Sequence, residues 1–239
     1  MARTDRRIEA VLFDLGGTLI DNYDYAHWAE LARKCFVEVD EESVAHAVAE
    51  IEKEMDVDRG VVRDEWTFPE FWRAILARAS GRDVDVPTAE RFLALTRERP
   101  GFTRLYSDTR RCLDELKAEG RRLAIVSNSS SEARVRAILH ANGLLPYFER
   151  IVSSGTEGVS KPDPEIFRRA LSRMQLAAET TLYVGNLAYI DAAAARAAGL
   201  HSIWLNRAGT GLGDGPPEIT SLLEVPLCVR RIEAGAPPA

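Results

Sequence analysis

The feature that most constrains the fold is a repeated alternation of short apolar runs with amphipathic stretches. The apolar runs lie at residues 10–13, 123–126, 150–152, 181–184 and 202–205. Runs this short and this apolar are typical of strands that are buried on both faces. From residue 108 onward, helical patterns lie between them, at 108–119, 131–141, 164–174 and 190–198. Strands that alternate with helices predict an α/β fold whose parallel sheet is connected by right-handed crossovers.

One long segment interrupts this alternation. Between residues 21 and about 100 the apolar residues follow a helical period, which predicts helices at 25–37, 41–55, 68–79 and 87–97. Pro69 and Pro87 suit the first turns of their helices. The sequence therefore predicts an α/β core made of residues 1–20 and 101–239, with an all-helical subdomain of residues 21–100 inserted after the first strand.

Polar residues follow several of the predicted strands. Asp14 follows the first strand, Ser127 the strand at 123–126, and Gly185 with Asn186 the strand at 181–184. Ligands of open parallel sheets bind beyond the carboxyl ends of the strands, so we expect these residues to share one site. Lys161, which Pro162 follows directly, lies in a connection of the same sheet.

Composition and charge favour a small-molecule ligand. The 239 residues carry a formal charge of −6 with both signs mixed along the chain, and this pattern disfavours nucleic acid and anionic lipid as partners. The sequence has no run of about 18 or more apolar residues and no secretory segment near its start, so we expect no membrane association and a cytoplasmic location. Both a monomer and a homodimer are compatible with the sequence.

Taken together, the motifs resemble those of a known superfamily. In chain order they are Asp14-Leu-Gly-Gly-Thr18, Ser127-Asn128, Lys161-Pro162-Asp163-Pro164, and Gly185-Asn186 with Asp191. This ordered set is similar to the four motifs of the haloacid dehalogenase-like (HAD) hydrolases, and the helical insertion resembles their cap. The resemblance implies a Rossmann-like parallel sheet with helices on both faces and a helical cap subdomain.

The resemblance also implies roles for individual residues. Asp14 would be the nucleophile that forms a covalent aspartyl intermediate, supported by Thr18. Ser127 and Lys161 would bind the transferring group and balance its charge. The expected substrate-binding residues include Gly16 and Gly17 of the first motif. They also include Asn128, because backbone donors near the start of the helix that follows Ser127 can hold an anion.

Two positions depart from the pattern of the superfamily's phosphatases. Gly16 stands where these enzymes carry a second aspartate that acts as general acid and base, and Asn186 stands where they carry another aspartate. The resemblance implies a magnesium site formed by Asp14, the Gly16 carbonyl, Asn186 and Asp191, weakened because Asn186 brings no negative charge. Asp191 would either supply that missing charge or orient Lys161.

Three functions remain open at this point. The first is a phosphatase acting on a small phosphorylated metabolite whose leaving group needs little protonation. The second is metal-independent displacement at carbon, as in the superfamily's dehalogenases, because a halide leaves without a proton. The third is a catalytically silent binding or regulatory protein, against which the intact Asp14, Ser127 and Lys161 argue.

The helical insertion would select the substrate. Its first residues include Tyr23, His27 and Trp28, which we expect at the substrate site, with His27 as the simplest replacement for the missing acid. Further aromatic and cationic side chains follow at Arg59, Arg63, Trp66, Trp72 and Arg73. Most aromatic residues of such helices serve packing, which is the alternative interpretation of this set.

Overall fold

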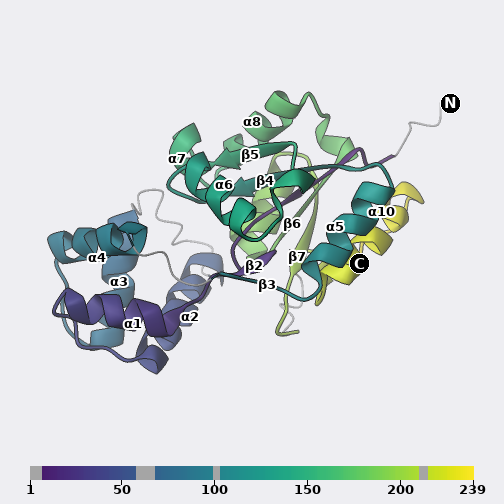
Figure 1. The fold of residues 1–239 in the computed structure, drawn as a ribbon. Coiled ribbons are helices and arrows are strands. Elements are labelled where there is room, and N and C mark those ends of the chain that lie inside the picture. Colours follow the sequence, from purple (N-terminus) through teal and green to yellow (C-terminus); the bar gives the residue numbers. More distant parts are fainter. Residues whose placement is uncertain (1–6, 58–67, 99–102, 210–214) are drawn as a thin grey trace. The chain divides into compact units, whose positions relative to one another are not determined.

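The computed structural model describes residues 7–57, 68–98, 103–209 and 215–239 (Figure 1). Two compact units are found, one formed by Met1–Asp21 with Arg104–Ala239 and the other by Asn22–Thr103. The predicted boundary near residue 100 and the residues Arg59, Arg63 and Trp66 lie outside the described ranges.

The first unit is built on a six-stranded sheet with the order β5-β4-β1-β6-β7-β8. The strands are β1 (Ala10–Phe13), β4 (Arg122–Ser127), β5 (Arg150–Ser153), β6 (Thr181–Gly185), β7 (His201–Leu205) and β8 (Glu218–Ile219), and every neighbouring pair is parallel. The predicted α/β fold with a parallel sheet is thus confirmed, and all five predicted strands are present. The sequence analysis missed β8, because two residues show no apolar run.

Helices cover both faces of this sheet. One face packs against α5 (Thr109–Ala118), α6 (Glu132–Ala141) and α10 (Val225–Glu233), and α10 lies beside α5 (Figure 1). The other face packs against α8 (Glu165–Met174) and α9 (Ala194–Ala197). The shorter elements are η1 (Leu145–Tyr147), α7 (Ser154–Glu157), η2 (Ala178–Thr180), the π-helical turn η3 (Ala188–Ala193) and η4 (Leu222–Glu224).

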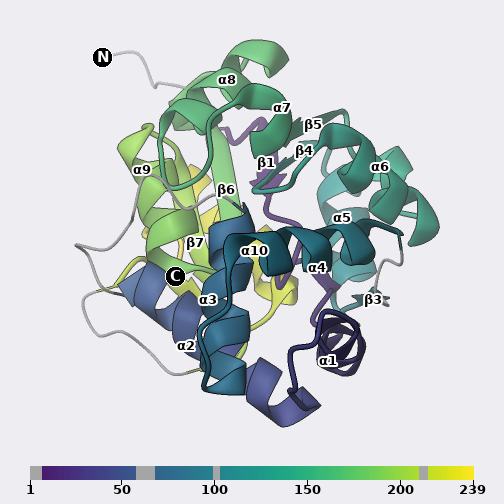
Figure 2. The same ribbon diagram turned by 90° about the vertical axis from the view of Figure 1, so that its left-hand side faces the viewer.

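The second unit is helical, and its helices can be followed in Figure 2. They are α1 (Tyr25–Lys34), α2 (Glu41–Val57), α3 (Phe68–Ser80) and α4 (Val86–Glu98). The side chains of Leu31, Ile75 and Phe92 are fully buried in its core. The chain enters and leaves this unit through two short strands, β2 (Ile20–Asp21) and β3 (Arg104–Leu105), which pair antiparallel. Among the described residues, no helix combines the length and the apolar character needed to cross a bilayer.

Candidate active site

The carboxyl end of β1 places Asp14 inside the first unit. Its backbone N–H donates to the Val184 carbonyl at 2.9 Å, so the residue is held against β6 just beyond the strand. The turn that follows is tight, with Gly17 N–H bonded to the Ile20 carbonyl at 2.8 Å. Only 7% of Asp14 is exposed. The central strand therefore delivers a nearly buried carboxylate at the sheet edge.

The turn after Asp14 requires glycine at position 17, for its backbone conformation and for its lack of a side chain. Its φ of +74° lies in the left-handed region, and a Cβ atom at this position would come within 2.5–3.1 Å of the Asn186 side chain. The absence of a side chain lets the amide of Asn186 reach the turn. There the Thr18 hydroxyl lies 3.2 Å from Asn186 Oδ1 and 3.5 Å from Asp14 Oδ2. Two motifs that are distant in the sequence thus meet at one hydroxyl.

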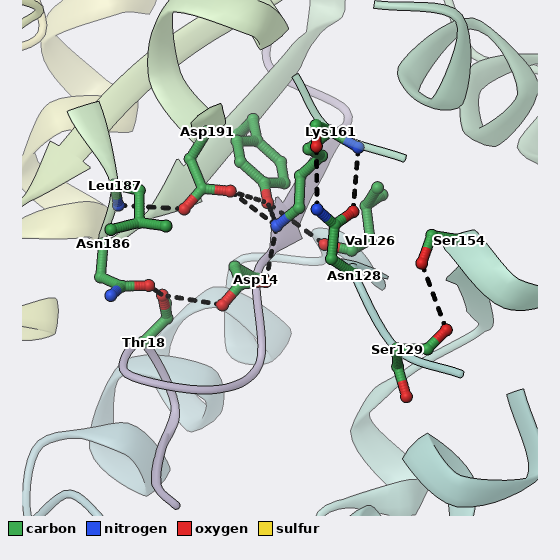
Figure 3. A network of polar contacts seen from close by, with 11 residues as sticks. Asp14, Thr18, Val126, Asn128, Ser129, Ser154, Lys161, Asn186, Leu187 and Asp191 are labelled. Atoms are coloured by element: carbon green, nitrogen blue, oxygen red, sulfur yellow. Dashed lines mark hydrogen bonds and ion pairs between the residues drawn. The ribbon is translucent and has the colours of Figure 1, made fainter. Parts of the chain in front are cut away.

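Lys161 links the two buried carboxylates (Figure 3). Its Nζ lies 2.6 Å from Asp14 Oδ1 and 2.6 Å from Asp191 Oδ1, and its side chain is 3% exposed. Charge-assisted hydrogen bonds of this length are among the strong ones in proteins. The other oxygen of Asp191, Oδ2, accepts from the Leu187 backbone N–H at 3.0 Å. Both oxygens of Asp191 are therefore engaged within the protein.

The side chain of Asn128 holds the backbone of Lys161 from both sides (Figure 3). Its Nδ2 donates to the Lys161 carbonyl at 2.8 Å, and its Oδ1 accepts from the Lys161 N–H at 2.9 Å. This pairing joins the end of β4 to the loop that carries the lysine. The Asn128 side chain, which the sequence analysis expects at the substrate, therefore contacts Lys161 in this structure.

Ser127 ends β4, the strand next to β1, and is buried. Of the serines after it, Ser131 caps α6, and its side chain accepts from the Arg134 N–H at 3.2 Å. Ser129 contributes its carbonyl, which accepts from Gly155 N–H at 2.9 Å and from the Ser154 hydroxyl at 3.2 Å (Figure 3). The loop after β4 is thus tied to α7.

Burial and neighbouring charges shift the pKa values of Asp14 and Lys161. Burial is the largest influence on Asp14 and, together with the negative charge of Asp191, raises the pKa of its carboxyl to about 6, although Lys161 opposes the change. Burial acts to lower the pKa of Lys161, but the charges of Asp14 and Asp191 outweigh it and raise that pKa. Lys161 is therefore protonated at neutral pH, and Asp14 ionises near pH 6.

The remaining predicted substrate residues belong to the helical unit. Tyr23 donates its hydroxyl to Glu52 Oε1 at 2.9 Å, and the backbone N–H of His27 bonds to Asp24, which caps α1. The Trp28 ring packs edge-on against Trp72, with centroids 4.8 Å apart. Within their own unit these residues make helix-capping and packing contacts, and their contact with substrate stays a prediction.

Two residues near the site were missed by the sequence analysis. The Tyr183 hydroxyl, from β6, lies 3.0 Å from Lys161 Nζ. Arg207 donates through Nη2 to the Thr18 carbonyl at 2.8 Å and pairs with both oxygens of Asp108 at 2.9 and 3.1 Å. The sequence held one signal for each residue. Tyr183 brings a hydroxyl into an apolar strand, and Arg207 follows the strand at 202–205, near the edge of the sheet where ligands bind.

Comparison with known proteins agrees with this geometry. A family model described as haloacid dehalogenase-like hydrolase matches residues 8–199. The glyceraldehyde 3-phosphate phosphatase of Pyrococcus furiosus is 28% identical over 83% of this chain and 81% of that protein. The (S)-2-haloacid dehalogenase 2 of a Pseudomonas species is 25% identical over 92% of this chain and 94% of that protein.

A solved structure shows the same fold. A magnesium-bound HAD hydrolase from Bacillus subtilis has a TM-score of 0.75 and 23% identity, covering 93% of this chain and 99% of that one. Residues 8–199, which the family model matches, include every motif that builds the site around Asp14 and Lys161. The chain belongs to the haloacid dehalogenase-like hydrolase family.

Proposed function

We propose that this hydrolase is a phosphatase that acts on a small phosphorylated metabolite through a covalent intermediate on Asp14. The observation that carries the proposal is the asymmetric setting of the Asp14 carboxylate. Its Oδ1 contacts Lys161 at 2.6 Å, whereas Oδ2 is 3.5 Å from the Thr18 hydroxyl. Relatives named as phosphatases of glyceraldehyde 3-phosphate and phosphoserine support phosphoryl transfer as the reaction class.

The reaction has two displacement steps. Asp14 Oδ2 attacks phosphorus, and the bond to the leaving oxygen breaks with its electron pair on that oxygen. Water then attacks the phosphorus of the aspartyl phosphate, the phosphorus–Oδ2 bond breaks, and inorganic phosphate leaves. Over the cycle, one hydrogen of the water stays on inorganic phosphate, and the other passes to an alkoxide or phenolate leaving group or, where a carboxylate leaves from an acyl phosphate, to the solvent. Ser127 and the ammonium of Lys161 stabilise charge on the transferring group.

Gly16 limits the range of leaving groups. A positioned general acid contributes about 10²–10⁴ in rate, and glycine has no side chain to donate a proton. We therefore propose substrates whose leaving group is a weak base, such as acyl phosphates. His27 and the other residues of the helical unit are the candidates for an alternative donor and for substrate selection.

The oxygen atoms around Thr18 fit a weakly held magnesium ion. Asn186 Oδ1, which lies 3.2 Å from the Thr18 hydroxyl, and the Gly16 carbonyl are neutral oxygens that a hard cation accepts, and the Asp14 carboxylate would contribute the oxygen that does not attack phosphorus. No group of three His, Cys, Asp or Glu side chains suited to a metal is found in the described part of the chain. We assign Asp191 to Lys161, because both of its oxygens are engaged. A bound magnesium ion would neutralise charge on the transferring group.

The test of this function is Asp14→Asn, assayed with acetyl phosphate, aryl phosphates and alkyl phosphates. Turnover should vanish in the variant, and the parent should prefer acetyl and aryl phosphates. Asp114→Asn is the matched control, because Asp114 is exposed on α5 and contacts Tyr147. Retained turnover in Asp14→Asn would exclude Asp14 as the nucleophile. Equal rates for all leaving groups would show that a proton donor exists.

Restoring the two missing carboxylates tests the magnesium site. Gly16→Asp combined with Asn186→Asp should raise magnesium-dependent hydrolysis of p-nitrophenyl phosphate by roughly 10²–10⁴. The two changes should be more than additive, because both act around one metal ion. A folded double variant that binds magnesium without any gain would count against the phosphatase proposal.

Displacement at carbon is the second candidate. The contact between Asp14 and Lys161 places a cation beside the nucleophile without any metal, and one relative is named a 2-haloacid dehalogenase. Release of chloride from 2-chloropropionate, abolished in Asp14→Asn and independent of magnesium, would favour this candidate over phosphate hydrolysis.

A further inference from the structure

Tyr183 brings a hydroxyl group into an otherwise apolar layer of the core. Every residue of β6 is buried, and Tyr183 is fully buried on the face that packs against α8. Its ring meets that of Phe167 edge-on, with centroids 4.7 Å apart and planes at 78°. The ring thus has an ordinary packing role, but a buried phenol hydroxyl also needs hydrogen-bond partners.

The partners of this hydroxyl belong to the site. Its oxygen lies 3.0 Å from Lys161 Nζ, 2.9 Å from Asp191 Oδ1 and 3.2 Å from the Val126 carbonyl. An ammonium group has no acceptor, so the phenol oxygen must accept from Lys161. The single phenol proton is then left for Asp191 or for the Val126 carbonyl. Tyr183 is therefore bonded to the lysine as an acceptor.

The three hydrogens of the Lys161 ammonium match three acceptors. These are Asp14 Oδ1 at 2.6 Å, Asp191 Oδ1 at 2.6 Å and the Tyr183 oxygen at 3.0 Å. Three acceptors fix both the place of Nζ and its rotation about the bond to Cε. Without the Tyr183 hydroxyl, two carboxylates would hold the ammonium, and its third hydrogen would have no partner among these groups.

The position of the Lys161 ammonium sets the orientation of the Asp14 carboxylate. Lys161 holds Oδ1, and this contact leaves Oδ2 on the side of the Thr18 hydroxyl. In the proposed reaction Oδ2 is the attacking atom, and attack requires close alignment with phosphorus. Displacement of a reacting group by about 1 Å can cost about 10²-fold in rate.

We propose that Tyr183 is a positioning residue whose hydroxyl fixes the Lys161 ammonium and thereby presents Asp14 Oδ2 for attack. The catalytic part of this inference rests on the proposed function of Asp14 and Lys161. The contact itself is a property of the folded protein and can be measured without turnover.

The first test is the kinetics of Tyr183→Phe, which keeps the ring and its contact with Phe167. The value of kcat for acetyl phosphate should fall about tenfold, as for loss of one hydrogen bond to a charged group, with KM within about twofold. Tyr147→Phe is the matched control, because it removes another tyrosine hydroxyl, bonded to Asp114 at 2.5 Å in the same unit. The control should retain the parental kcat.

The second test observes the ammonium group of Lys161 directly by ¹H–¹⁵N NMR of lysine side chains. A buried ammonium with three acceptors should give a slowly exchanging signal, assigned by its loss in Lys161→Arg. Tyr183→Phe should broaden or abolish that signal, and Tyr147→Phe should leave it unchanged. An unchanged signal in Tyr183→Phe would overturn the proposal, as would a parental kcat in that variant. If the parent hydrolyses no phosphate compound, the proposed function fails, and the NMR signal still decides whether Tyr183 fixes Lys161.

Discussion

Gly185→Ala should disable the site by moving Asp191. Gly185 ends β6, and a Cβ atom at this position would lie 2.4 Å from Asp191 Cγ and 2.5 Å from Asp191 Oδ2. Ordinary contacts of a Cβ atom begin near 3.4 Å, so the carboxylate must move by about 1 Å. Asp191 cannot turn away freely, because Leu187 N–H, Lys161 and Tyr183 all hold it.

The size of the effect follows from these distances. A shift of about 1 Å would lengthen the contact between Asp191 and Lys161 from 2.6 Å to beyond hydrogen-bonding range. Misplacement of this size costs about 10²-fold in rate, and overpacking of a core costs about 1–3 kcal/mol of stability. We therefore expect kcat for acetyl phosphate to fall by about two orders of magnitude, with a lower Tm.

A control variant separates the loss of kcat from the loss of stability. Gly120 follows α5 in the same unit and has φ +76°, and among the described residues a Cβ atom there would meet only Arg7 Nη2, at 3.8 Å. Gly120→Ala should therefore lose about 1–2 kcal/mol through backbone strain and retain kcat. If Gly185→Ala kept a kcat within about twofold of the parent, the assignment of Asp191 as the group that holds Lys161 would be refuted.

Three further predictions concern residues around the site. The folded-state pKa of Asp14, about 6, exceeds its ordinary value of 3.8, so ionisation destabilises the fold. The free energy of unfolding of Asp14→Asn, measured with urea, should exceed that of the parent by an amount that grows from pH 4 to pH 6 and is constant at higher pH. A difference that shrinks over that range would contradict the raised pKa. Asn128→Ala should leave the Lys161 N–H and carbonyl unpaired, costing about 1–3 kcal/mol and lowering kcat, and a parental kcat would show that this pairing is dispensable. Arg207→Met should cost roughly 2 kcal/mol, between the values for exposed and buried ion pairs, and should lower kcat through Thr18; an unchanged kcat would limit Arg207 to a structural role.

The sheet could be predicted because its information is local. Each strand of four or more residues contains a short run of apolar side chains. Both faces of such a strand are buried, so the run is required at any position in the sheet. The strands β2, β3 and β8 have two residues each, so they show no period, and their pairing is decided by neighbours distant in the sequence. The cap of α6 is equally local, because the Ser131 side chain accepts from the backbone N–H of Arg134, three residues further on.

The site was predictable only as a set of residue types at strand ends. The resemblance predicts that Asp14 and Lys161 share a site and leaves Asp191 either at a metal or at Lys161, but it does not predict the direction of any side chain. The amide of Asn128 turns to the Lys161 backbone, and the Tyr183 hydroxyl reaches Lys161 from inside the core. Such contacts depend on the crossing of separate elements, which no local pattern specifies.

The charges of the site explain why Asn186 is compatible with it. Asp14 and Asp191 carry two negative charges, and Lys161 supplies one positive charge, so the buried cluster keeps one excess negative charge. That excess, together with burial, raises the pKa of Asp14. An aspartate at position 186 would add a third carboxylate beside Thr18 and make ionisation of Asp14 still less favourable without a metal ion. Asparagine keeps an oxygen there without the charge, so Asp14 can ionise near pH 6 with Lys161 as its counter-ion, and a magnesium ion bound there would be held less tightly than by an aspartate.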